Sequence, residues 1–351
     1  MDHPTSKCSG SCKICTVKLK NLSFDTKDLS DVLKLWGLNL KDIHKEINIE
    51  GSPERSEYRV VCEDERGELY VVEKIHRDSF DRKKRIALTL DFLKGKGLGK
   101  IGPCKKNLKG EFVSEYKHCF WQIVNYIDGI DLPRPDYVFD KWRGSQLAEF
   151  YIDLKDKSSD LPFFNSSEVF SVKDYIYELI KTIKEKKPGM FERLSPVVVF
   201  LEKDFMKAYD SFPVSFCHGD YHMLNMVWGE SQINAVIDWE FSGIKPEIYD
   251  VANMLGCLGI EHPNSLTNEL VIEFLSKLKE AGLFSEVSWK YLLEFVVAQR
   301  FAWLSEWLRK DDLEMQDLEE YYIKLLIEKK DVLKNCWDSL SDSKEELICL
   351  S

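Results

Sequence analysis

The chain carries two different patterns of apolar and polar residues. Before residue 128, short apolar runs rich in β-branched and aromatic residues alternate with polar turns, which is typical of β-strands. Strands are predicted over 43–49, 58–62, 69–75 and 120–127. Apolar spacing predicts short helices over 29–40 and 79–93. We therefore expect residues 25–127 to form a small antiparallel sheet with helices beside it.

From residue 128 onward, apolar residues recur every three or four positions, as on one face of a helix. Helices are predicted over 137–154, 172–183, 197–212, 266–278, 289–308 and 318–333. Strands that cluster early and helices that cluster late indicate an α+β fold instead of an alternating βαβ sheet. Since 351 residues exceed what one core comfortably supports, we predict two lobes, 25–127 and 128–351.

Residues 1–24 contain Cys8, Cys12 and Cys15 among polar residues and have little apolar content, so we expect a flexible tail. The spacing C-x3-C-x2-C could bind zinc together with His3, or an iron–sulfur cluster, and both alternatives stay open beside the plain tail. Most other cysteines lie in apolar or mixed segments, where a reduced thiol behaves as a small core residue. No disulfide framework is expected.

The net charge of −11 disfavours nucleic acid as the main partner, because phosphate backbones are bound by basic surfaces. The same charge is compatible with a cationic small-molecule partner. No apolar stretch approaches the length of a membrane span, and the first residues lack the apolar segment of a secretory signal. We expect a cytoplasmic protein, either a monomer or a homodimer, without a membrane partner.

Three oxygen-bearing side chains lie at informative spacing in the run HGDYHMLNMVWGESQINAVIDWE. Asp220 and Asn225 are predicted to lie on a loop after the strand 214–217, and Asp238 at the end of the strand 233–237. A phosphoryl-transfer site needs hard oxygen ligands for divalent cations and a separate base beside the acceptor hydroxyl. These residues supply both. The alternative is a hairpin whose Asp and Asn residues only cap turns.

The letters HGDxxxxN followed by IDWE resemble the aminoglycoside phosphotransferase and choline kinase family, small-molecule relatives of the protein kinases, over residues 47–333. The resemblance implies a two-lobed protein-kinase-like fold that uses ATP and Mg²⁺. It assigns Asp220 as the base that accepts the hydroxyl proton, and Asn225 and Asp238 as the metal ligands.

The same resemblance implies supporting roles for three further residues. His218 would support the catalytic loop, Asp250 would brace it, and Glu240 closes the IDWE motif. Protein kinases instead carry a glycine-rich loop, then HRD, then DFG. This chain has no DFG, and its HRD at 76–78 and GxGxxG at 97–102 stand in the wrong order, so we interpret both as chance matches.

The loop EGSPERSE occupies the place where kinases fold a turn over the triphosphate. Gly51 and Ser52 are small enough for close backbone approach, and Arg55 could contact phosphate. An ordinary hairpin turn uses the same residue types, so both interpretations stay open.

Lys74 matches the kinase lysine that binds the first two phosphates, and Val72 would then cover the adenine. A surface lysine on an edge strand is the alternative. Two departures from the kinase pattern weaken the match. Glu73 stands where an apolar residue is usual, and the following helix offers no glutamate to orient Lys74, only Asp81 or Asp91.

The apolar strand before Asp128-Gly129 is interpreted as the hinge between the lobes. By resemblance, backbone groups of Asn125, Tyr126 and Ile127 would bond the adenine edge. A plain buried strand is compatible with the same residues, because a hinge uses only its backbone.

Trp303, Glu306 and Trp307 lie near the place where relatives hold their acceptor. Aromatic faces and a carboxylate could bind an ammonium-bearing alcohol. Tryptophans at helical spacing are more often core residues, and we favour that reading.

The leading functional hypothesis is an ATP-dependent small-molecule kinase that phosphorylates a hydroxyl of an amino sugar, an amino alcohol or a related metabolite. A nucleotide-binding sensor or scaffold that keeps the kinase shape is the alternative, because Lys74 lacks its usual partner. A protein kinase is the third possibility, disfavoured by the absence of DFG.

Overall fold

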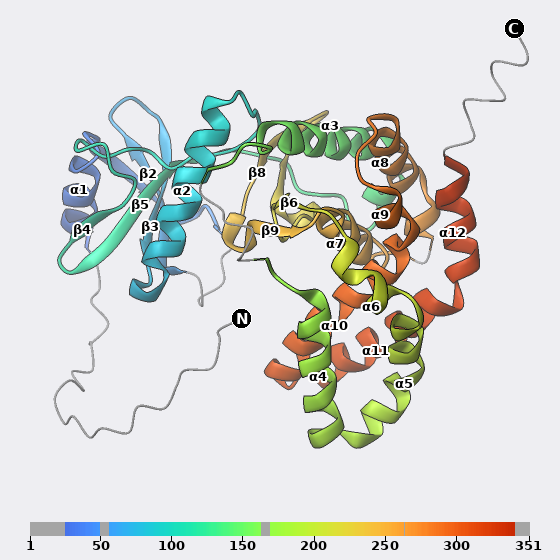
Figure 1. Cartoon of the computed structure of the whole chain (residues 1–351). Helices are drawn as coiled ribbons and strands as arrows, with labels where there is room; N and C mark the ends of the chain where they lie inside the picture. The colour runs from blue at the N-terminus through green and yellow to red at the C-terminus, as the bar shows by residue number, and fades with distance from the viewer. Residues whose placement is uncertain (1–24, 50–55, 163–168, 263, 341–351) are drawn as a thin grey trace, which may run out of the picture.

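The computed structural model describes residues 25–49, 56–162, 169–262 and 264–340. It has two lobes, a small one built on a sheet and a larger, mainly helical one (Figure 1). The fold is therefore α+β and two-lobed, as the order of the elements predicted. None of the helices in these described ranges is long and apolar enough to span a bilayer.

The smaller lobe is a five-stranded antiparallel sheet in the order β1-β2-β3-β5-β4. Its elements are α1 (Thr26–Lys34), β1 (Leu40–His44), β2 (Ser56–Asp64), β3 (Leu69–Ile75), α2 (Phe80–Gly95), β4 (Ser114–Tyr116) and β5 (Cys119–Asn125), with a 3-10 turn, η1 (Arg77–Ser79), before α2. The helix predicted over 29–40 ends early, because Gly37 adopts φ 70° and turns the chain into β1.

The two faces of this sheet carry different residues, since successive side chains of a strand point to opposite faces. Leu29 and Val32 of α1 pack on one face against Val72 and Trp121. On the other face α2 packs through Ala87, beside Val124 of β5. Figure 1 shows α1 on the side remote from the larger lobe and α2 on the side nearest to it.

The larger lobe holds two short antiparallel ladders, β6 with β9 and β7 with β8, surrounded by helices. Its longer elements are α3 (Lys141–Lys157), α4 (Val172–Lys186), α5 (Pro188–Lys203), β6 (Val214–Cys217), β7 (Met226–Trp228), β8 (Ile233–Val236), β9 (Gly243–Pro246), α7 (Tyr249–Leu258), α8 (Glu269–Glu280), α10 (Leu292–Lys310), α11 (Leu313–Glu328) and α12 (Lys330–Asp338). Shorter ones are η2 (Asp136–Phe139), α6 (Phe205–Ala208), η4 (Tyr209–Ser211), η5 (Met223–Asn225), η6 (Trp239–Phe241), η7 (Ser265–Thr267) and α9 (Glu286–Lys290).

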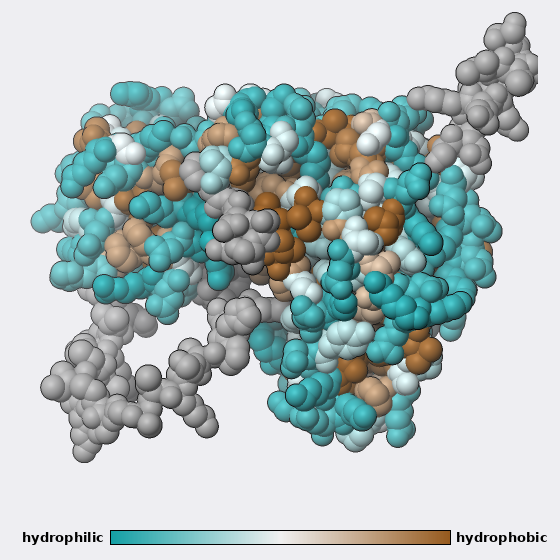
Figure 2. All heavy atoms as spheres, viewed as in Figure 1, coloured by the Kyte–Doolittle hydropathy of each residue, from teal (hydrophilic) through white to brown (hydrophobic). Residues whose placement is uncertain are grey.

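One large hydrophobic core runs through this lobe and underlies the ladders. Figure 2 shows hydrophilic surface over most of the visible face, with hydrophobic atoms gathered near the middle, where Figure 1 draws β6 and β9. The predicted helix 197–212 is in fact the end of α5 followed by α6 and η4, and the helix predicted over 318–333 is divided between α11 and α12.

Candidate active site

The loop that follows β6 is held by a buried carboxylate. Asp250, in the first turn of α7 and fully buried, accepts hydrogen bonds from the backbone N–H groups of His218 (2.7 Å) and Gly219 (2.8 Å). Gly219 has φ +85°, and a Cβ there would lie 2.0 Å from the carbonyl oxygen of Phe241. Two charge-assisted bonds and a position open only to glycine therefore fix the backbone just before Asp220.

The imidazole of His218 joins this loop to the end of β8. Its Nε2 lies 2.9 Å from the carbonyl oxygen of Ile237, and its Nδ1 accepts from the N–H of Asp220 at 3.2 Å. A carbonyl can only accept, so Nε2 carries the hydrogen and the ring is neutral. Burial lowers the pKa of His218, against the opposing effect of the Asp250, Asp220 and Asp238 carboxylates. Three carboxylates thus surround one uncharged ring.

Asp220 and Asn225 contact each other directly. The side-chain amide nitrogen of Asn225 donates to the backbone oxygen of Asp220 (2.8 Å) and lies 3.1 Å from its Oδ2. His222 contacts both residues, with Nε2 3.4 Å from Oδ1 of Asp220 and 3.1 Å from the amide nitrogen of Asn225. Because its nitrogen faces Asp220, the Asn225 amide leaves its oxygen for a cation.

Asp238 comes to the same place through the backbone. The N–H of Ile237 donates to the carbonyl oxygen of Asn225 at 2.9 Å, so the residue before Asp238 is bonded to Asn225 itself. Asp238 adopts a left-handed conformation, φ 63° and ψ 61°, which turns the chain sharply out of the strand. The structure therefore joins Asn225 to Asp220 through its side chain and to the residue before Asp238 through its backbone. Carboxylate and amide oxygens are the hard donors that Mg²⁺ takes.

The structure places Lys74 and Val72 away from the face where the kinase pattern expects them. Lys74 pairs across the ladder with Tyr58 and Trp121, on the sheet face covered by α1, and its amine forms an ion pair with Glu57. Val72 is fully buried in the same α1 cluster. Both side chains therefore lie on the sheet face that α1 covers, and α1 is remote from the larger lobe (Figure 1). Their roles in phosphate binding and adenine cover stay predictions.

The sheet face toward α2 instead carries Glu73, which the sequence interpretation noted only as an anomaly. Glu73 accepts from Lys83 of α2 at 2.9 Å and from Ser56 and Gln122. Lys83 also reaches Glu240 of η6 at 2.5 Å. A glutamate in an apolar strand was the only signal in the sequence for this buried network, and nothing marked Lys83.

The predicted hinge residues follow β5 as it leaves the sheet. Asn125 is the last residue of β5, and Tyr126 donates its N–H to the carbonyl oxygen of Leu69 at 2.9 Å. That bond occupies the N–H of Tyr126, and Cys104 forms an antiparallel bridge with Val124, the residue before Asn125. The adenine contact that the resemblance implies stays a prediction. Gly51, Ser52 and Arg55 lie outside the described residues.

The predicted acceptor residues form a cluster on α10. The rings of Trp303 and Trp307 stack with centroids 6.2 Å apart. Glu306 is paired with Arg309 and Lys310, and these cations lower the pKa of Glu306 to about 2. Because its charge is already compensated by neighbours on its own helix, Glu306 has little left for a cationic acceptor. The role in acceptor binding stays a prediction.

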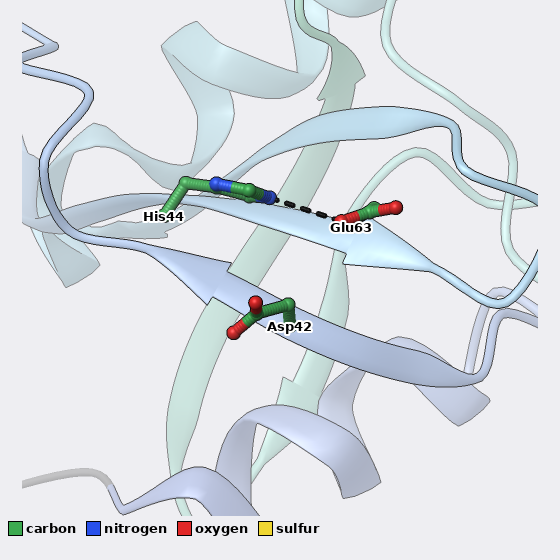
Figure 3. A group of neighbouring side chains, drawn as sticks. All are labelled: Asp42, His44 and Glu63. Atoms are coloured by element: carbon green, nitrogen blue, oxygen red, sulfur yellow. Dashed lines mark hydrogen bonds and ion pairs between the residues drawn. The ribbon is translucent and has the colours of Figure 1, made fainter.

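A second group of polar side chains lies at the edge of the small sheet (Figure 3). His44 Nε2 lies 3.1 Å from Glu63, beside Asp42, and Lys41 binds the other oxygen of Glu63 at 2.6 Å. Glu46, at 2.7 Å, and Glu63 together raise the pKa of His44. The group already contains its own cations, so it gives no indication of a metal. Cys8, Cys12 and Cys15 lie outside the described residues.

The two-lobed α+β fold is that of kinase-like phosphotransferases. The chain matches the model of the phosphotransferase enzyme family, APH, over residues 49–292, and it belongs to that family. No curated protein matches it.

Solved structures agree with this fold. An aminoglycoside phosphotransferase from Alicyclobacillus acidocaldarius superposes with a TM-score of 0.62 at 11% identity, covering 90% of this chain and 95% of that one. Amicoumacin kinase, solved in complex with AMP-PNP, Ca²⁺ and a ligand named Ami, superposes with a TM-score of 0.63 at 13% sequence identity. The match covers 87% of this chain and 94% of that one. A choline/ethanolamine kinase family protein from Mesorhizobium loti superposes with a TM-score of 0.55 at 13% sequence identity, and the match covers 86% of this chain and 92% of that one.

Proposed function

We propose that this protein transfers the terminal phosphate of ATP to a hydroxyl of a small molecule. One observation carries the proposal: the Asn225 amide bonds Asp220 directly, and its backbone bonds the residue before Asp238. Asn225 thereby links the proposed base to the segment of the second proposed metal ligand, next to a loop that Asp250 and Gly219 hold in a fixed conformation.

Asp220 is the proposed base. It would accept the proton of the acceptor hydroxyl at the carboxylate oxygens that now face His222 and Asn225. The neutral ring of His218, bonded to the N–H of Asp220, holds the backbone of the base in place without adding a second titrating group. The loop thus orients the acceptor oxygen instead of taking part in covalent chemistry, as phosphoryl transfer requires.

Asn225 and Asp238 are proposed to hold Mg²⁺. A neutral amide oxygen and one carboxylate fit a cation that keeps places for water and for phosphate oxygens. When bound, Mg²⁺ would neutralise charge that develops on the phosphates.

The proposed class of acceptor rests on the similar solved structures and on the net charge of the chain. Solved neighbours include an aminoglycoside phosphotransferase, an amicoumacin kinase and a choline/ethanolamine kinase family protein. The net charge of −11 suits an acceptor that carries an ammonium group. We therefore place amino sugars, amino alcohols and related metabolites first, with the protein acting in the cytoplasm.

The test is a screen with radiolabelled ATP over a panel of hydroxyl metabolites, with a parallel arm in GTP. Asp220→Asn is expected to lower turnover by about 10²–10⁴-fold, the usual contribution of a general base. Asp204→Asn, which changes an exposed carboxylate that makes no helix-cap bond, is the matched control. Product formed by Asp220→Asn at the wild-type rate would remove Asp220 from this role.

The metal assignment has its own test. Asp238→Ala is expected to abolish the magnesium dependence of nucleotide binding, because one of two protein ligands is lost. A magnesium titration with unchanged affinity would contradict it. Tight ATP binding with no labelled product from any metabolite would favour the sensor alternative over a kinase.

A further inference from the structure

The buried ion pair between β3 and α2 has the opposite polarity from the one that kinases use. In protein kinases a lysine on the third strand grips phosphates and a glutamate on the following helix orients it. Here the strand supplies the carboxylate of Glu73 and the helix supplies the ammonium of Lys83. The lysine that the sequence offered for this role, Lys74, lies on the opposite sheet face with Glu57.

The position of Lys83 is fixed from both lobes. Its ammonium lies 2.9 Å from Glu73 and 2.5 Å from Glu240, and the residue is only 6% exposed. Glu240 stands two residues after Asp238, so the ammonium lies beside the segment that carries a proposed metal ligand. An ammonium has three donors, and these two carboxylates use two of them, which leaves one for a further anion.

The charges of this buried network cancel once Lys83 is counted. Glu73 alone on this face would repel a triphosphate. Burial acts to lower the pKa of Lys83, but Glu73 and Glu240 outweigh it and raise the pKa, so the amine stays charged. Arg59, opposite Glu73 on β2, adds a second cation 3.9 Å from the same carboxylate. Lys83 and Arg59 therefore balance Glu73 and Glu240, so this network by itself adds no net repulsion toward a phosphate.

Glu73 is itself held rigidly, as an orienting group must be. Ser56 donates to one of its oxygens and Gln122 to the other. With Lys83, three side chains from β2, β5 and α2 satisfy one carboxylate, so Glu73 has little freedom to swing toward a ligand. The part of this network that can donate to a phosphate is the ammonium of Lys83.

We propose that Lys83, oriented by Glu73 and Glu240, is the residue of the smaller lobe that contacts the nucleotide phosphates, so that lysine and glutamate have exchanged elements relative to the kinase pattern. This inference rests on the proposed nucleotide site. It requires that a change at Lys83 weakens the binding of phosphates and leaves the binding of the nucleoside alone.

The experiment is calorimetric titration of the full chain with Mg²⁺ and either AMP-PNP or adenosine. Lys83→Met is expected to weaken AMP-PNP binding at least about tenfold, the order of one lost charge-assisted hydrogen bond, with adenosine affinity unchanged. Lys83→Arg keeps the charge and should retain part of the affinity. Lys74→Met, on the other sheet face, should bind both ligands as the wild type does.

Two further variants keep the test decisive if Lys83→Met fails to fold. Glu73→Gln with Lys83→Met removes both charges of the strand–helix pair together, which avoids leaving that carboxylate unpaired, and should show the same selective loss. Glu73→Lys with Lys83→Glu and Glu240→Gln restores the usual polarity without setting two carboxylates against each other, and it should recover AMP-PNP binding relative to Lys83→Met.

The outcomes distinguish failure of the role proposed for Lys83 from failure of the proposed function. A folded Lys83→Met with wild-type AMP-PNP affinity overturns the inference, as does an equal loss for adenosine, which would make Lys83 purely structural. Failure of the exchanged pair to recover binding also counts against it. If the wild type itself binds neither AMP-PNP nor GTP analogues with Mg²⁺, the proposed function fails instead.

Discussion

Asp250→Asn tests the support of the catalytic loop by the smallest possible change. Both oxygens of Asp250 now accept from consecutive N–H groups, His218 at 2.7 Å and Gly219 at 2.8 Å, in a fully buried place. An asparagine of the same shape has one oxygen and one NH₂ group. It can satisfy one N–H, but it must then point a donor at the other.

The cost follows from that geometry. One charge-assisted bond of about 1.5–3 kcal/mol is lost, and the facing N–H becomes a buried unsatisfied donor. Since these two contributions overlap, we expect the free energy of unfolding to fall by about 3 kcal/mol, out of the about 5–15 kcal/mol that holds a typical domain. Turnover should fall as well, by about tenfold to a hundredfold, because a small displacement of the loop moves the base Asp220.

Urea denaturation followed by tryptophan fluorescence measures the first quantity, and steady-state kinetics with the acceptor found in the screen measures the second. Asp204→Asn is again the control, since the same chemical change at an exposed carboxylate should cost less than about 0.5 kcal/mol. Wild-type stability and turnover in Asp250→Asn would refute the claim that this carboxylate holds the loop.

Two further predictions concern the same loop. Gly219→Ala should lower the free energy of unfolding by more than about 1 kcal/mol and remove most activity. The reason is that the new Cβ would lie 2.0 Å from the carbonyl oxygen of Phe241, at a residue with φ +85°. A soluble, fully active variant would contradict this prediction. His218 has a lowered pKa, so below about pH 6.5 the unfolded chain binds a proton that the folded one does not, and stability falls as pH falls by up to about 1.4 kcal/mol per pH unit. Urea unfolding at pH 7.5 and 5.5 should show a smaller loss in His218→Gln than in the wild type; equal losses would show that His218 is not the group responsible.

The sequence was sufficient where neighbouring residues decide the structure. The loop between β6 and β8 was predictable, because strand patterns on both sides fix where Asp220, Asn225 and Asp238 lie along the chain. The division into an early sheet and later helices was predictable for the same reason. Helix ends were less accurate, since single residues such as Gly37 end an element that periodicity alone would continue.

The sequence did not distinguish the two faces of β3. A shift of one position exchanges the two faces of a strand, and it separates Val72 and Lys74, on the α1 side, from Glu73, which contacts Lys83 of α2. Both faces of β3 are buried, one under α1 and one toward α2, so its apolar pattern did not say which face was which. The clue was Glu73, a charge among apolar neighbours, which we noted as a departure and did not use.

The sequence by itself therefore determined the class of fold and the spacing of the Asp220, Asn225 and Asp238 set, because both depend on residues that are close along the chain. Only the tertiary structure showed which distant residues contact the segments that carry this set. Lys83 meets Glu240 across more than 150 positions, and Asp250 bonds an N–H 32 positions away. Contacts of this kind depend on how α2 and α7 pack, and no local pattern of side chains encodes that packing.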